Sequence, residues 1–163
     1  MGQRELILVL GALTIFGMTI LTANKFIVSQ NDEMLEHEFE YFAASLAQGY
    51  IEEARSMAYD ETVINNTPGS LPTGFTSSGS LGPNGGEGYN DYNDVDDFDG
   101  YSETIDSGRG DFIVDIVVAY VDPTDPDNTT SSKRFCKKMT VTVTNDMLNH
   151  PVILSQVFGY IKN

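Results

Sequence analysis

The pattern of apolar and polar positions begins with a stretch that is apolar on every side. The eighteen residues from Leu6 to Ala23 carry no charge. As a helix this run is about 27 Å long, close to the hydrocarbon thickness of a bilayer. A cleaved secretory signal is disfavoured, because Leu21 is too large for the small-residue position of a cleavage site. Residues 1–30 are therefore predicted to form an apolar helix that crosses a membrane or lies in the interior of an assembly.

The pattern becomes amphipathic over residues 31–61. Large apolar side chains recur at steps of three and four, while Glu33, Glu36 and Glu40 lie on another face. This spacing predicts a helix whose apolar face packs on a sheet. Two arrangements are open: a new helix capped near Asn31, or one continuous helix from the N-terminus to Tyr59. The apolar positions are Leu35, Phe39, Phe42, Leu46, Tyr50, Ala54 and Met57.

The second half of the chain first loses its periodicity and then alternates. Residues 62–110 are rich in Gly, Ser, Pro, Asn and Asp, which predicts a long loop built from turns. Residues 111–163 contain three runs typical of strands, Asp111–Val121, "FCKKMTVTVT" and "PVILSQVFGYI". The predicted fold is α+β, with a long N-terminal helix packed on a small antiparallel sheet, and residues 31–163 forming one globular head.

Charge and composition narrow the function classes. The chain has 24 acidic and nine basic residues, a formal charge of −15, which disfavours nucleic acid as a partner. Its single cysteine, Cys136, allows no intrachain disulfide. Neither His37 nor His150 lies in a nucleophile or metal pattern, so the protein is predicted not to be an enzyme. The basic cluster of Lys133, Arg134, Lys137 and Lys138 is expected to meet carboxylates of this chain or of a neighbouring copy.

An acidic cluster in the predicted loop is a candidate calcium site. Hard oxygen ligands at close spacing suit Ca²⁺, and one flexible loop can supply several of them. The alternative is a solvated acidic turn whose carboxylates cap backbone amides. Calcium is the only cofactor that the residues suggest. The cluster consists of Asp91, Asn93, Asp94, Asp96, Asp97 and Asp99.

The N-terminal residues carry a resemblance to a known family. Glu5 lies four residues after Met1 and directly before "LILVLGALTIFGM". An apolar N-terminal helix that continues into an amphipathic helix on an antiparallel sheet resembles the type IV pilin superfamily. Over about the first 60 residues the likeness is one of motif, and beyond them one of element order alone. Members of this superfamily polymerise through their apolar helices, with a glutamate at the corresponding place after the first mature residue.

The resemblance implies an assembly site at Met1, Arg4 and Glu5. In that reading the Met1 α-amino group of an adjacent subunit is the partner of Glu5, and Arg4 is a competing cation. The implied protein is a structural subunit of an extracellular cell-surface filament, a type IV pilus or fimbrium. Its partners would be identical subunits, with the cytoplasmic membrane holding it before assembly. The alternatives are a membrane-anchored β-domain binding module or adhesin, and a secretion-system pseudopilin.

Overall fold

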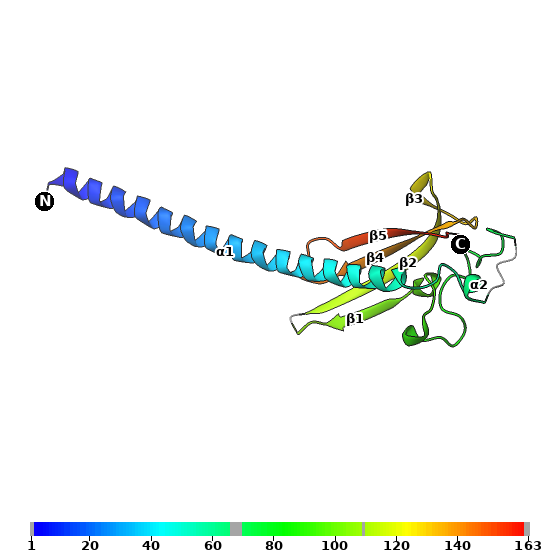
Figure 1. Cartoon of the computed structure of the whole chain (residues 1–163). Coiled ribbons are helices and arrows are strands. Elements are labelled where there is room, and N and C mark those ends of the chain that lie inside the picture. Colours follow the sequence, from blue (N-terminus) through cyan, green and yellow to red (C-terminus); the bar gives the residue numbers. More distant parts are fainter. Residues whose placement is uncertain (1, 66–69, 109, 162–163) are drawn as a thin grey trace. The chain divides into compact units, whose positions relative to one another are not determined.

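The computed structural model describes residues 2–65, 70–108 and 110–161, apart from the Asp32 side chain. They form an α+β fold with a long N-terminal helix and a small antiparallel sheet, as predicted (Figure 1). The chain divides into two compact units, Met1–Glu38 and Phe39–Asn163. The elements are α1 (Gln3–Arg55), α2 (Glu61–Ile64), 3-10 helices at Tyr89–Asp91 and Asp96–Phe98, β1 (Ser102–Asp106), β2 (Asp111–Asp122), β3 (Asp125–Thr130), β4 (Cys136–Thr144) and β5 (Val152–Gly159).

Of the two helical arrangements that the sequence left open, the structure has the continuous one. Helix α1 runs through the candidate cap at Asn31 without a break. It ends at Arg55, earlier than predicted. The backbone N–H groups of Ser56 and Met57 bond to carbonyls three residues back, which tightens the last turn. Ala58 then donates its N–H to the carbonyl of Asn93, and this contact draws the chain away from the helical path.

The sheet has the order β1-β2-β4-β5, and β3 pairs with the C-terminal end of β2. All pairs are antiparallel, and β2 and β4 are the inner strands. The three predicted strands are present. Two further strands lie in stretches predicted as loops, and this prediction was wrong. Strand β1 is short and largely exposed, and β3 has a turn-rich composition, so only their pairing with β2 makes them strands.

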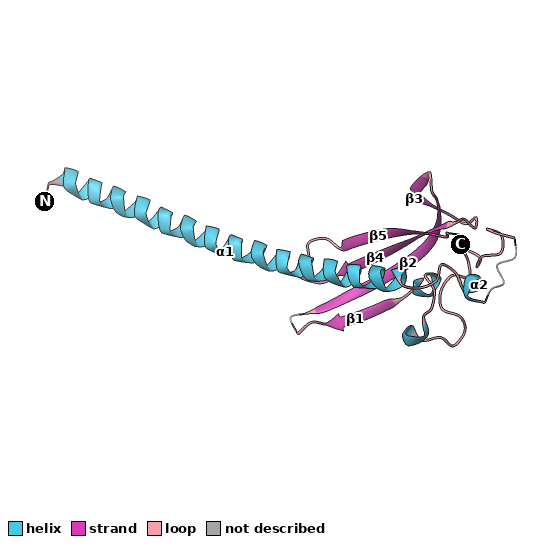
Figure 2. Cartoon of the chain, in the orientation of Figure 1, coloured by secondary structure: helices cyan, strands magenta, loops and turns pink. Residues whose placement is uncertain are grey.

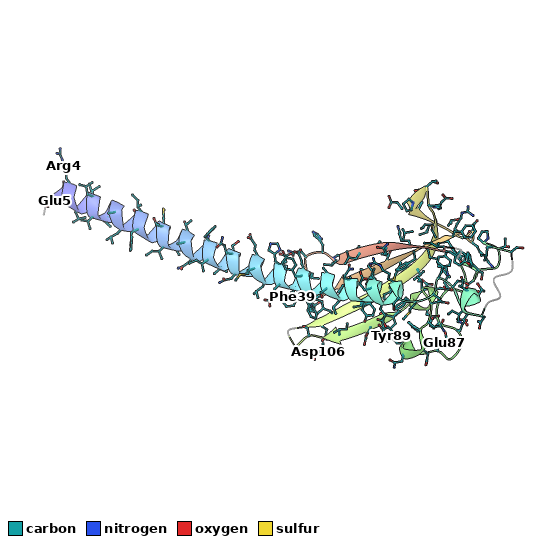
Figure 3. The ribbon with its side chains drawn as sticks, viewed as in Figure 1. Arg4, Glu5, Phe39, Glu87, Tyr89 and Asp106 are labelled. Atoms are coloured by element: carbon teal, nitrogen blue, oxygen red, sulfur yellow. The ribbon has the colours of Figure 1, made fainter. Side chains whose placement is uncertain are left out.

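One face of the sheet packs against the second half of α1 (Figure 2). Alternate residues of β2 and β4 are buried, and Phe112 stacks on Phe39, whose place on α1 is labelled in Figure 3. Most of the predicted apolar face of the helix is buried or packs against the core: Phe39, Tyr50 and Ala54 are buried, and Leu46 and Met57 lie against the core. Leu35 and Phe42 are more exposed, at 43% and 40%, and two small side chains outside the prediction, Ala43 and Ala47, are fully buried.

Candidate functional site

The first candidate is the apolar surface at the start of α1. Among the described residues, α1 is the one helix long and apolar enough to cross a membrane, although a signal sequence passes the same test. Its large apolar side chains are mostly more than half exposed, from Leu6 at 55% to Phe26 at 62%. An apolar surface of this extent needs lipid or other protein to cover it. The structure therefore supports a possible membrane-spanning helix at the N-terminus.

Glu5 begins this surface and has a local partner. The Gly2 backbone N–H donates to Glu5 Oε2 over 3.1 Å, and Figure 3 shows Glu5 and Arg4 together at the start of α1. A carboxylate in the first turn also interacts favourably with the helix dipole. Within one subunit Glu5 thus acts as a helix cap. Met1 lies outside the described residues, so the pairing of Met1 with Glu5 of a neighbour stays a prediction.

The residues of the calcium candidate do not form a metal cage. No group of three or more His, Cys, Asp or Glu side chains among the described residues could hold a metal ion. The carboxylates instead accept backbone N–H groups: Asp94 Oδ1 from Asp96 and Asp97, and Asp97 Oδ2 from Asn93 and Asp94. Asp99 Oδ1 accepts from Val118 of β2 at 2.8 Å, and Asp91 Oδ2 from Gly88 at 3.2 Å. This geometry favours the alternative reading, an acidic turn that caps its own backbone.

Chelation is accordingly expected to leave the melting temperature of the full chain unchanged. The carboxylates of Asp94, Asp97 and Asp99 already have backbone donors, so the loop does not depend on an ion to offset their charge. Thermal unfolding in detergent, with excess EDTA against excess Ca²⁺, measures this. A melting temperature that rises with calcium and falls with EDTA would restore the calcium site.

A different site is centred on Lys137, which lies on β4 and is fully buried. Its ammonium nitrogen donates to Asp60 Oδ2 at 2.8 Å, to Asp96 Oδ1 at 2.5 Å and to the Tyr59 carbonyl at 2.9 Å. The rings of Tyr59 and Tyr120 lie 4.6 and 5.4 Å from the same nitrogen. A single amine thus meets two buried carboxylates inside an aromatic enclosure.

Three separate segments position these groups. Asp60 is the N-cap of α2 and accepts the backbone N–H of Thr62. A short parallel bridge between Ala58 and Asp94 holds this segment beside the loop that carries Asp96. Strand β4 then presents Lys137 from its inward face. The site therefore forms only once helix exit, loop and sheet are in place.

The sequence analysis predicted the ion pairing of the basic cluster but not the burial of Lys137. The basic cluster was expected to meet carboxylates of the chain or of a neighbour, and two members do so within the chain: Lys137 with Asp60 and Asp96, and Arg134 with Asp122 at 3.5 Å. Burial of the lysine was missed. The signal was present, because Lys137 is in phase with the buried positions Met139, Val141 and Val143 of β4.

The pKa values of the carboxyl groups at this site shift in opposite directions. Desolvation opposes ionisation of Asp60, but hydrogen bonds from Lys137 and Thr62 outweigh it and lower the pKa of that carboxyl. Desolvation and the neighbouring carboxylates of Asp96 and Asp97 raise the pKa of Asp94 to about 9. The raised pKa favours the protonated form of Asp94. Its Oδ1 accepts the backbone N–H groups of Asp96 and Asp97, and its buried Oδ2 has no hydrogen-bond partner among the described residues.

The Asp94 shift predicts a specific pH dependence of stability. Its pKa is raised on folding, so the folded state binds a proton that the unfolded chain releases above about pH 4. This group therefore lowers the free energy of unfolding as pH rises from about 4 to about 9. Asp94→Asn is expected to remove this pH dependence. The free energy of unfolding of the variant, relative to that of the wild type, is therefore expected to increase as pH rises.

The measurement is denaturant unfolding of both full-length proteins in detergent at several pH values from 4 to 9. Asp106→Asn is the matched control, because Asp106 is exposed and accepts only the Gly108 N–H among the bonds described. A wild-type-like pH slope in Asp94→Asn would show that Asp94 is ionised in the folded protein.

No family model, no curated protein and no solved structure matches the chain. The assignment of function therefore depends on the exposed apolar helix and on the acid at its start.

Proposed function

We propose that the protein is a structural subunit of a pilin-like helical filament, polymerised through the apolar first part of α1. The observation that carries the proposal is the long apolar surface from Leu6 to Phe26, exposed on all sides of one continuous helix. The order of elements that follows, an amphipathic helical half on an antiparallel sheet, supports it by resemblance to type IV pilins. Before assembly the same helix would hold the subunit in the cytoplasmic membrane, and afterwards the filament would lie outside the cell.

The position of the acid within this helix favours a filament over a plain anchor. Glu5 precedes the uncharged run directly. In a plain anchor this residue can stay at the headgroup level, where a carboxylate costs little. In a filament, helices of neighbouring subunits overlap with axial offsets, which carries Glu5 among apolar side chains. There it needs a cation, and the α-amino group of Met1 or the guanidinium of Arg4 can supply one.

Negative-stain microscopy separates the two functions. Material sheared from cells, and purified protein after removal of detergent, are expected to contain fibres of uniform width. A membrane-anchored binding module would instead stay with the cells on shearing and remain monomeric in detergent. Monomers in every condition, with the head correctly folded, would overturn the filament.

A further inference from the structure

We propose that Lys137 and Asp60 condense to form an intramolecular amide bond that ties the segment after α1 to strand β4. The inference does not depend on filament assembly, because every group involved lies within one head. It starts from the Lys137 site, where an amine and a carboxyl group are in contact without water between them: Nζ lies 2.8 Å from Asp60 Oδ2, and both side chains are fully buried.

The surroundings of the pair exclude water. The enclosing residues Tyr120 and Phe75 are 0% and 1% exposed, and the ring of Tyr59 packs against Phe75 with centroids 5.0 Å apart. Amide formation releases water, so a dry enclosure favours the condensed product. Two reacting groups held at contact distance also gain an effective concentration of about 10⁵–10⁸ M over the same groups in solution.

The hydrogen bonds of Asp60 favour attack of the Lys137 nitrogen on its carboxyl carbon. Its Oδ1 accepts the backbone N–H and hydroxyl of Thr62, at 3.2 and 2.6 Å, and the hydroxyl of Thr76 at 3.3 Å, while the Thr76 backbone N–H is shared between Oδ1 at 3.3 Å and Oδ2 at 3.0 Å. Donors converging on one oxygen stabilise the negative charge that develops there when nitrogen attacks the carboxyl carbon. The other oxygen, Oδ2, faces Lys137 and is the one that departs.

Asp96 is the proton carrier. Its Oδ1 is 2.5 Å from Nζ, and its backbone N–H donates to Oδ1 of Asp94 at 2.8 Å. The Nζ–H proton passes to Asp96 and from there to Oδ2 of Asp60, so that a free amine faces a neutral carboxylic acid. The amine attacks Cγ of Asp60, and Asp96 carries a second proton from the same nitrogen to Oδ2. The C–Oδ2 bond breaks and water leaves, while Nζ keeps one hydrogen. Ammonium plus carboxylate thus become amide plus water, with no oxidant or cofactor and with Asp96 restored.

Condensation replaces the Lys137–Asp60 ion pair by a neutral group. Burying an ammonium and a carboxylate removes both from water at a cost that their attraction only partly offsets. The amide carries no charge, and its oxygen keeps the donors of Thr62 and Thr76. Its single remaining N–H can donate to Asp96 or to the Tyr59 carbonyl, the two other acceptors of Lys137.

The decisive experiment is the intact mass of the purified full-length protein after denaturation. The expected mass is lower than that of the sequence by one water molecule. Proteolysis is then expected to yield a branched peptide joining the fragments that contain residues 60 and 137. The matched control is Lys137→Arg, which keeps a cation but cannot form this amide, and its mass is expected to be that of its sequence.

Three results would overturn the proposal. One is a wild-type protein with the full mass of its sequence, because the pair would then be ionic. Another is loss of water that persists in Lys137→Arg, which would place the reaction elsewhere in the chain. The last is a branch that joins Lys137 to a residue other than Asp60. The intact mass of the wild-type protein tests the amide even if Lys137→Arg does not fold, because this measurement needs no variant.

Discussion

Lys137→Met is expected to lower the free energy of unfolding by about 3–5 kcal/mol, the largest stability effect of any single change considered. Methionine has a similar length and fills the space of the lysine stem, so the loss does not come from a cavity. It comes from Asp60 and Asp96, which keep their burial and lose the lysine nitrogen between them, together with the proposed amide to Asp60. The head also loses its link between the segment after α1 and strand β4.

Denaturant unfolding of the full chain in detergent measures this loss. The matched control is Lys138→Met, the next residue on β4, which is on the other face and contacts the carbonyl of Asp127 at 3.3 Å. A change within about 0.5 kcal/mol is expected there. Neutralising both acids in Lys137→Met, with Asp60→Asn and Asp96→Asn, is expected to restore part of the stability. Equal effects of the Lys137 and Lys138 variants would contradict a buried-charge role.

Glu5→Gln is expected to reduce assembled fibre about tenfold or more while leaving the subunit folded and inserted in the membrane. A hydrogen bond that involves a charged group is worth about 1.5–3 kcal/mol, and every 1.4 kcal/mol is a factor of ten in an association constant. Glutamine keeps the shape and an acceptor oxygen for the Gly2 N–H, so the helix start is preserved. What it removes is the charge that would pair with Met1 or Arg4 of a neighbour.

Fibre yield in sheared material, normalised to subunit in the membrane fraction, measures this effect. Glu33→Gln is a suitable control, because Glu33 is an acid of the same helix beyond the uncharged run. Its yield is expected to match the wild type. If Glu5→Gln fibres form at normal abundance and length, Glu5 serves only as the helix cap seen in the single subunit.

Prediction from sequence succeeded where one local pattern is enough. The uncharged run, the three long strands and the α+β class all follow from periodicity within a few residues. It failed where a partner lies far along the chain. Strands β1 and β3 have no apolar alternation of their own and depend on β2. Most of the buried helix face was predicted, but the fully buried Ala43 and Ala47 were missed because their side chains are small.

The Lys137 site shows the same limit more sharply. Its partners Asp60 and Asp96 are 77 and 41 residues away in the chain, so no local spacing connects them. The acidic cluster was predicted to be either a calcium site or an acidic turn that caps its own backbone, and the hydrogen bonds favour the second. Asp94 and Asp97 bond to backbone amides, while Asp96 bonds to a lysine that no local spacing indicates.

The position of the Lys137 site determines where a pulling force along α1 would act. Asp60 follows shortly after the end of that helix, and Lys137 is on β4, which has β2 on one side and β5 on the other. Tension that leaves the helix at Arg55 would thus enter the sheet at an inner strand before it reached the rest of the loop. There it would meet the Lys137 nitrogen, which three short bonds hold in the ion-paired form and which the proposed amide would join covalently to Asp60, whereas an edge attachment could be peeled off one bond at a time. The segment after α1 is therefore joined to the sheet at a point where several bonds must break at once.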